Sequence, residues 1–294
     1  MLSASPYALR GYTLLKFEPH LHTLHSDGQD DVATMFEACR SAGYDAVALT
    51  DHNTVSGLAE AGGVANELGL ILIPGIEITT FRGHAVALGV AQVPEWRDLE
   101  VRGMDALAAD VRGAGGLLSV AHLMAFGSPV CSGCAWEWPI EPTSIDLLEV
   151  LSSPNPHTEA PLAFWRQLLK RGGRVAPVAA GDVHSAAAAA RERPTTWVFV
   201  RERSREGVLE ALRQRRVVAS IGVVPDFWLE DNNGALALIG EQIGQSRWTP
   251  RVGASAVVET VEVRNGQRAV YAVRRNAHDR LEAVSAPIWI DTSQ

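Results

Sequence analysis

Short apolar runs alternate with amphipathic segments along the first three quarters of the chain. Runs typical of buried strands cover residues 13–17, 45–50, 70–74, 85–90, 117–121, 146–151 and 175–180. Segments with apolar residues at helical spacing lie between or after these runs, at 31–42, 55–68, 104–113, 159–170 and 204–213. In the first of these segments, Asp30 or Asp31 is available as the N-cap. This alternation predicts an α/β fold, either a parallel barrel or a doubly wound sheet.

The pattern changes near Pro225. From there to Gln294 the sequence contains short β-type segments and two Asn-Gly pairs, Asn233-Gly234 and Asn265-Gly266, which are strong hairpin signals. We therefore expect two parts, a barrel over residues 1–224 and a small β-rich appendage over residues 225–294.

Composition narrows the class of protein. The chain has 294 residues, of which 47% are hydrophobic, enough to bury a sizeable core. Its net charge of −8 argues against a nucleic-acid partner, because such binding draws on cationic side chains. Three cysteines are too few for a disulfide scaffold, and no apolar stretch is long enough for a membrane span or a secretory signal. We expect a soluble, cytoplasmic protein without a membrane partner; the sequence leaves its oligomeric state open.

Imidazoles and carboxylates gather at the ends of the predicted strands. Seven of the nine histidines lie at such junctions: His20, His22, His25, His52, His84, His122 and His184. Carboxylates at the same junctions are Asp27, Asp51, Glu77, Glu149 and Asp182. The carboxyl ends of parallel strands form one face of a barrel, where active sites are built. His84 is the exception, because it precedes its run and must reach this face along the strand or from a bent one.

These residue types predict a metal site with more than one ion. Alternate residues of a strand share a face, so His20 and His22 can bind one ion together, and the same spacing holds for Asp182 and His184. Neutral imidazole with carboxylate suits zinc, manganese or iron. Any one of these residues alone is more often a cap or a satisfied polar group, but the ensemble favours a metallohydrolase.

The ordered motifs resemble those of the PHP (polymerase and histidinol phosphatase) superfamily. They are His20-Leu21-His22-Thr23, Ser26-Asp27-Gly28, Thr50-Asp51-His52-Asn53, Gly75-Ile76-Glu77, Gly83-His84, Ala121-His122 and Gly181-Asp182-Val183-His184. Within it the chain looks most like the CehA/McbA-like metallohydrolases. The segments that support this branch are Asp146-Leu147-Leu148-Glu149-Val150, Pro194-Thr195-Thr196 and Ala286-Pro287-Ile288-Trp289-Ile290. Leu123 departs from the family pattern, in which Pro usually follows this histidine, but no ligand is lost.

The resemblance implies a distorted (β/α)7 TIM-like barrel that holds two to three divalent ions. Carried over by motif, the first ion takes His20, His22, Glu77 and Asp182. The second takes Glu77 as a bridge, with His84 and His122, and the third takes Asp27, His52 and His184.

The expected chemistry is hydrolysis by a metal-bridging hydroxide held by Glu77, since two cations lower the pKa of a shared water. No Gly-x-Ser-x-Gly motif supplies a protein nucleophile. His25 and Asp51 are candidates for the leaving-group acid, or for partners that orient a ligand imidazole. Glu149 could contact the site from the sixth run or serve a structural role.

Substrate contacts are harder to assign. Arg82 and Arg191 or Arg193 could bind phosphate, or could be ordinary surface residues. Trp136 and Trp138, in the long segment after His122, could line the entrance to the site. Cys131 and Cys134 in the same segment are expected to be two loop thiols rather than a further metal or redox site.

The sequence thus favours a metal-dependent phosphoesterase that acts on a small phosphate ester. A second possibility is a carboxylic or carbamate ester or amide hydrolase of the CehA/McbA type, since the same hydroxide can attack a carbonyl carbon. A third is a metal-loaded binding or regulatory protein without turnover, or a proofreading-like module acting on nucleic-acid ends.

Overall fold

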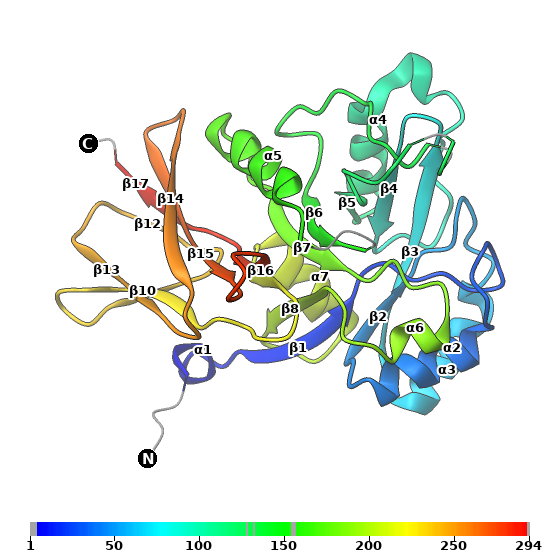
Figure 1. Cartoon of the computed structure of the whole chain (residues 1–294), viewed down its shortest axis with the longest axis horizontal. Helices are drawn as coiled ribbons and strands as arrows, with labels where there is room; N and C mark the ends of the chain where they lie inside the picture. Colours follow the sequence, from blue (N-terminus) through cyan, green and yellow to red (C-terminus); the bar gives the residue numbers. More distant parts are fainter. Residues whose placement is uncertain (1–4, 128, 132, 154–156, 293–294) are drawn as a thin grey trace.

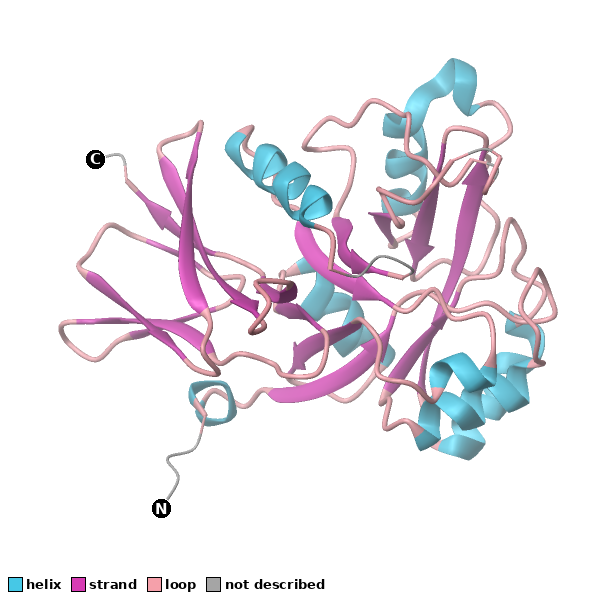
Figure 2. Ribbon diagram, viewed as in Figure 1, coloured by secondary structure: helices cyan, strands magenta, loops and turns pink. Residues whose placement is uncertain are grey.

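The computed structural model describes residues 5–127, 129–131, 133–153 and 157–292, and it is a mixed α/β structure (Figure 1, Figure 2). Its helices are α1 (Pro6–Leu9), α2 (Val32–Ser41), α3 (Leu58–Leu68), α4 (Leu99–Gly113), α5 (Glu159–Lys170), α6 (Ala186–Ala189) and α7 (Arg205–Arg213). The strands of the N-terminal part are β1 (Thr13–Glu18), β2 (Ala46–Leu49), β3 (Ile71–Thr80), β4 (Gly83–Leu88), β5 (Leu117–Val120), β6 (Leu147–Ser152), β7 (Ala176–Ala180), β8 (Thr195–Val200) and β9 (Val217–Ser220). Those that follow are β10 (Phe227–Asp231), β11 (Leu236–Leu238), β12 (Gln242–Ile243), β13 (Trp248–Val252), β14 (Val257–Val263), β15 (Gln267–Arg275), β16 (Leu281–Ser285) and β17 (Ile288–Asp291).

All seven apolar runs of the first part form strands, and the five amphipathic segments form α2, α3, α4, α5 and α7; the short helices α1 and α6 were not predicted from the periodicity. Two of the helix starts are capped as local sequence dictates. The Asp31 carboxylate accepts a hydrogen bond from the Thr34 amide at the start of α2. The Ser204 hydroxyl accepts one from the Gly207 amide at the start of α7.

The strands of the first part form a curled, half-barrel sheet. Its order is β9-β8-β1-β2-β3-β4-β5-β6-β7. Neighbours in β1–β3 and in β5–β7 pair in parallel, whereas β4 is antiparallel to both β3 and β5. On the other side, β8 is antiparallel to β1 and β9 is antiparallel to β8. The structure therefore does not confirm a (β/α)7 barrel of parallel strands, because β4 and β8 run opposite to the other seven strands.

The curl brings the segments that follow β1 and β7 together. Leu21 and Val183 form an isolated parallel bridge beyond these strands, with hydrogen bonds of 2.8 Å from the His22 amide to Val183 O and 3.1 Å from the Val183 amide to His20 O. The Thr196 side chain joins β8 to β7, since its hydroxyl contacts both the amide and the carbonyl of Ala179. The curl thus brings together loops that are far apart in the sequence.

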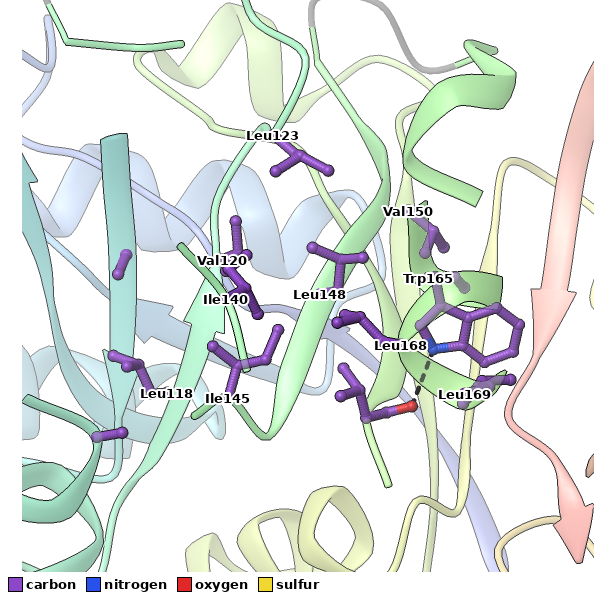
Figure 3. Close-up of a cluster of buried hydrophobic side chains, with 14 of the residues drawn as sticks. Leu118, Val120, Leu123, Ile140, Ile145, Leu148, Val150, Trp165, Leu168 and Leu169 are labelled. Atoms are coloured by element: carbon purple, nitrogen blue, oxygen red, sulfur yellow. Dashed lines mark hydrogen bonds between the residues drawn. The ribbon is translucent and has the colours of Figure 1, made fainter. Parts of the chain in front are cut away.

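The apolar core runs under this sheet and into the C-terminal strands. Figure 3 shows part of it: Leu148 and Val150 of β6 lie beside residues of α5, and Leu118 and Val120 of β5 lie beside Ile140 and Ile145. The Trp165 indole donates to Val175 O at 2.9 Å, so the polar atom of this buried ring is satisfied. Its ring also packs edge-on against Tyr271 of β15, with centroids 5.0 Å apart.

Residues after Pro225 are β-rich, and both expected hairpins are present. The Asn233-Gly234 turn joins β10 to β11, and the Asn265-Gly266 turn joins β14 to β15. These strands are not set apart from the first part, however, because β16 pairs with β9 and extends the same sheet. The boundary at residue 224 therefore stays a prediction. Every described helix is too short or too polar to cross a bilayer.

Candidate metal centre

Histidines and carboxylates meet at the carboxyl end of the curled sheet. The bridge between Leu21 and Val183 fixes the backbone on both sides of the cluster, so the His20 and His22 rings face the Asp182 carboxylate. Asp182 Oδ1 lies 3.5 Å from His20 Nε2 and 3.2 Å from His22 Nε2. These three side chains form one group able to hold a metal ion.

Glu77 of β3 stands at the centre of the cluster and is fully buried. Its Oε2 atom lies 3.1 Å from His20 Nε2, 3.3 Å from His22 Nε2 and 2.9 Å from His52 Nδ1. Its Oε1 atom lies 3.0 Å from His84 Nδ1 and 3.1 Å from His122 Nε2. The two oxygens of one carboxylate therefore face two different sets of imidazoles, which is the placement that a bridging ligand needs.

A third group lies on the more open side of the cluster. Asp27 Oδ1 is 3.3 Å from His184 Nε2, and Asp27 Oδ2 is 3.4 Å from His52 Nε2. The Asp27 side chain is 56% exposed, in contrast to the buried Glu77. Together with His22, these residues form another group able to hold a metal ion.

The reversal of β4 explains how His84 joins this cluster. His84 comes near the start of its strand, but β4 is antiparallel to β3 and β5, so its amino end lies beside their carboxyl ends. Pairing of His84 with Thr79 across the hairpin then brings the imidazole to Glu77. His84 needs no bent strand to reach the site.

The ligand atoms are better placed to coordinate metal ions than to form hydrogen bonds with one another. Buried ligand atoms without a hydrogen-bond partner include His20 Nε2, both ring nitrogens of His22, Glu77 Oε2, His84 Nε2 and His122 Nδ1. Leaving such atoms unpaired in a buried site is costly. Two ligands of a tetrahedral zinc ion, each about 2.0 Å from it, lie about 3.3 Å apart, which matches the spacing of facing atoms in this cluster. The donor set of imidazoles and carboxylates therefore suits divalent metal binding.

Glu149 of β6 orients two of the histidines. Its Oε1 atom lies 2.9 Å from His20 Nδ1, and its Oε2 atom accepts hydrogen bonds of 2.7 Å from the His122 amide and the Ser152 hydroxyl. The contact at His20 Nδ1 leaves Nε2 directed toward Glu77 and Asp182. A carboxylate behind a ligand imidazole is the usual way in which proteins fix its tautomer and direction.

Glu18 was not among the residues singled out from the sequence, yet it is fully buried at the end of β1. Its carboxylate accepts hydrogen bonds from the Gly181 amide at 2.9 Å and the His20 amide at 3.1 Å. Burial raises the pKa of Glu18 to about 8. Its signal in the sequence is weak, because one acidic residue at a strand end has no motif of its own.

The charges in the cluster compensate one another in the absence of metal. Burial opposes the charge on His52, but the Asp27 and Glu77 carboxylates outweigh it and raise its pKa to about 10. Against a similar burial penalty, nearby carboxylates also raise the pKa of His20 and His122. Conversely, hydrogen bonds to His184 and His52 hold the pKa of Asp27 well below its usual range. Protons therefore occupy positions for which a metal ion would compete.

Two of the residues expected as ligands have left-handed backbones. The φ angles of His122 and Asp182 are 27° and 47°. Non-glycine residues rarely adopt such angles, and the strain persists where surrounding contacts determine the conformation. At both positions this backbone turns the chain sharply at the end of a strand.

His25 and Asp51 lie near the cluster in sequence, but they have other partners. The His25 ring contacts the Ser56 hydroxyl at 2.8 Å and Glu60 Oε1 at 2.9 Å. Asp51 accepts hydrogen bonds from Thr23 and from the Ser26 hydroxyl, and so it holds the loop that carries Asp27. In the described structure neither residue hydrogen-bonds to an imidazole of the cluster.

The candidate substrate contacts have partners of their own outside the cluster. Arg82 is engaged by Glu100 at 3.1 Å, by Glu137 O at 3.1 Å and by the ring of Trp138. The Trp138 side chain is buried, with its indole donating to Thr80 Oγ1, while Trp136 packs over Gly83. Both tryptophans thus anchor their loop to the β3–β4 hairpin. Arg191 is exposed and lines a separate cavity with Lys16 and Trp197, while Arg193 donates to Gly181 O beside Asp182.

Cys131 and Cys134 are joined as a disulfide, with Cα atoms 5.5 Å apart. The expectation of two separate loop thiols is therefore wrong. The remaining cysteine, Cys39, is free and buried in the core under α2.

The protein has a curled α/β sheet with imidazoles and carboxylates at its carboxyl end. This combination of fold and site is similar to that of metal-dependent hydrolases as a class. Comparison with known proteins makes the likeness more specific: the family model described as the PHP domain matches residues 18–129. That segment contains the expected ligands from His20 to His122. The match and the fold likeness below support the resemblance to the PHP superfamily.

Relatives share parts of the chain. Over 169 residues it is 29% identical to the phosphoribosyl 1,2-cyclic phosphate 1,2-diphosphodiesterase of Eggerthella lenta, a match that covers 52% of this chain and 61% of that protein. Over 65 residues it is 37% identical to a 5'-3' exoribonuclease of Haemophilus influenzae, covering 22% of this chain and 24% of the other. The chain thus spans less than two thirds of the length of these relatives.

A solved structure shares the fold over most of the chain. It is a two-domain protein from Bacteroides vulgatus, described as containing a predicted PHP-like metal-dependent phosphoesterase. The superposition has a TM-score of 0.60 at 19% sequence identity and covers 95% of this chain and 85% of the other.

Proposed function

We propose that this protein is a metal-dependent phosphoesterase that hydrolyses a small phosphate ester. The observation that carries the proposal is the buried set of donor atoms around Glu77, which lack hydrogen-bond partners and are spaced as ligands of shared ions. A structural zinc site would be closed by four ligands, whereas this cluster extends to the half-exposed side chains of Asp27, His52 and His184.

The proposed ligand sets are those that the family motifs imply, and they overlap the spatial groups His20–His22–Asp182, His22–Asp27–His52–His184 and His52–Glu77–His84. His20, His22, Glu77 and Asp182 would hold one ion, and Glu77, His84 and His122 a second. Asp27, His52 and His184 would hold a third on the open side. When bound, divalent ions of this kind lower the pKa of a coordinated water and offset negative charge on substrate oxygens.

The chain's own residues would position these ligands and admit the substrate. Glu149 directs His20 toward Glu77, and Asp51 holds the loop that carries Asp27. Because Asp27 is the most exposed carboxylate of the cluster, we infer that substrate approaches from its side. Glu77, at the centre of the cluster, is fully buried and lies behind His52 as seen from Asp27.

The relatives favour phosphate esters over other substrates. One has a diphosphodiesterase name, another an exoribonuclease name, and the similar structure a phosphoesterase description. These names belong to those proteins, and they support the same reaction class for this chain.

Hydrolysis of a carboxylic or carbamate ester or an amide, as in the CehA/McbA-like branch, is the second candidate. One observation favours it: Arg82 is engaged by Glu100 and Glu137, and no described arginine forms an ion pair with a carboxylate of the cluster. Without an arginine at the site, the metal ions alone would have to neutralise the negative charge of a bound phosphate.

A paired turnover assay tests the proposal. Protein supplied with manganese or zinc is given an aryl phosphate ester and the matching aryl carboxylic ester, with D182A as background. Faster turnover of the phosphate, absent in D182A, is the expected result. Preference for the carboxylic ester would move the protein to the second candidate, and no turnover of either ester by metal-loaded protein would contradict an esterase.

A further inference from the structure

A second polar cavity lies at the opposite end of the sheet from the histidine cluster. Strands β1, β7 and β9 run in the same direction. Their amino ends therefore lie together, at the end of the sheet opposite to the histidine cluster. A cavity of about 580 Å³ opens there. Its lining, which we call the arginine cavity, includes Arg10, Tyr12, Arg174, Arg215, Arg216 and Glu241.

Two of the four arginines are neutralised by carboxylates. Arg10 pairs with Glu241 at 2.6 Å, and Arg216 pairs with Glu210 at 3.0 Å. The other two form no ion pair with any described residue. Arg174 donates to the side-chain amide oxygens of two glutamines, Gln242 at 2.9 Å and Gln267 at 2.6 Å.

Arg215 is the less satisfied of the two. Its Nη1 atom donates to the backbone carbonyls of Arg213 and Arg174 at 3.0 and 3.5 Å, and its buried Nε atom has no hydrogen-bond partner. The nearby carboxylates are engaged elsewhere, since Asp146 pairs with Arg112 and Asp291 accepts from the glutamine amides. Neither guanidinium group therefore has a described carboxylate in direct contact with it.

The arrangement is costly for an empty site. Both arginines are partly buried, and taking a cation out of water without a contacting carboxylate is unfavourable, although the Arg174 guanidinium is also stacked on Trp289 at 3.8 Å. Burial, with Arg215 nearby, lowers the pKa of Arg174 to about 10. Arg215 also has a φ of 57°, a strained angle for an arginine. Both residues also line a neighbouring cavity of about 210 Å³.

We propose that the arginine cavity binds a small phosphate-bearing anion between Arg174 and Arg215. Planar guanidinium groups match phosphate oxygens through paired hydrogen bonds, and two guanidinium groups that form no ion pair with a described carboxylate, those of Arg174 and Arg215, line this cavity. The volume lies within the range of small-molecule sites, so it accepts a phosphorylated metabolite as well as a free phosphate.

This site is distinct from the metal cluster. Strand β7 connects the two, with Arg174 before its first residue and Asp182 after its last. Extended chain of this length spans roughly 25 Å. A ligand in the arginine cavity would therefore bind without contacting the histidines, and the proposal does not depend on the function proposed above.

Calorimetric titration with inorganic phosphate, pyrophosphate and adenosine monophosphate tests the proposal and separates these sources. The variant R215G removes the guanidinium at a position where glycine accepts the observed φ without strain. R174Q removes the second cation, and R97Q, which alters an exposed arginine paired only with Glu95, is the matched control. D182A is included because phosphate could also bind at the histidine cluster.

The expected result is binding of at least one anion to wild type, R97Q and D182A, with a loss of about tenfold or more in R215G and R174Q. Thermal melts of each variant check folding. Equal binding by wild type and both arginine variants, or loss of binding only in D182A, would overturn the proposal. So would the absence of binding for all three anions.

Discussion

Glu77 shows how one side chain can organise a whole cluster. It contributes a single carboxylate, yet its two oxygens face imidazoles from five separate positions of the chain. Its burial removes competing water, so its partners are restricted to these rings. The residues that hydrogen-bond to these histidines from behind then fix the orientation of each imidazole ring.

Glu149 offers a direct test of this aiming. Replacing it in E149Q weakens the acceptor for His20 Nδ1 and for the His122 amide, so we expect metal affinity to fall by about 10–100-fold. Competition against a chelating dye measures the change. E60Q is the control, because Glu60 makes a similar 2.9 Å contact with His25 away from the cluster. Equal losses in both variants would contradict the role assigned to Glu149.

Metal binding should release protons. Carboxylates raise the pKa of His52 to about 10 against the effect of burial, so this ring holds a proton at pH 7 when no metal is bound. A metal ion displaces that proton, and apparent affinity should therefore increase from pH 6 to pH 8. Zinc titrations in two buffers of different ionisation enthalpy count the protons. Affinity that is independent of pH, with no protons released, would contradict the prediction.

The raised pKa of His52 has the opposite consequence for the stability of the metal-free protein, which should decrease rather than increase as the pH rises. A raised pKa means that protonated His52 stabilises the fold fully below its unfolded value, near 6.5, and that this contribution is lost as pH rises through about 10. Raising the pH into the alkaline range should therefore not increase the stability of the metal-free protein through His52.

At the scale of elements, the β3–β4 hairpin depends on Gly83. Its φ is 137°, and a Cβ atom there would lie 2.6 Å from Trp136 Cε3. We expect G83A to lose roughly 1–3 kcal/mol of stability and to displace the neighbouring His84. The control is G63A in α3, where a Cβ meets nothing within 4 Å, and which should gain about 0.5–1 kcal/mol. Thermal melts decide, and an unchanged melting temperature for G83A would contradict this packing.

The sequence predicted the elements better than their directions. Apolar runs located β1 to β7 but not β8 and β9, and motif order selected nine side chains that the structure gathers in one place. The direction of β4 was not predictable in this way, because an apolar run reads alike in parallel and antiparallel pairs. Glu18 and Glu149 could not be assigned from local pattern either, since their partners come from distant strands.

At the scale of the molecule, the C-terminal strands complete the sheet. Val284 of β16 pairs with Ala219 of β9, and the Tyr7 hydroxyl near the N-terminus donates to Phe227 O at 2.6 Å. Core residues of the first part also pack on Tyr271 and Trp289. The two parts expected from the sequence therefore share one core.

A fragment of residues 1–224 should consequently fold poorly. It lacks β16, which leaves β9 as an open edge and exposes apolar surface around Trp165. We expect aggregation or a strongly reduced melting temperature, measured by size-exclusion chromatography and circular dichroism against the full chain. A monomeric fragment as stable as the full chain would show that residues 225–294 are a true appendage.

The bridge between Leu21 and Val183 also sets a time order for the protein in the cell. Synthesis at about 5–20 residues per second takes roughly 8–30 s to cover the interval from His20 to His184. Until then the nascent chain displays early histidines without the late carboxylate that faces them. Ions captured before that moment would be held by an incomplete set of donors, so the emerging chain can still exchange one metal for another.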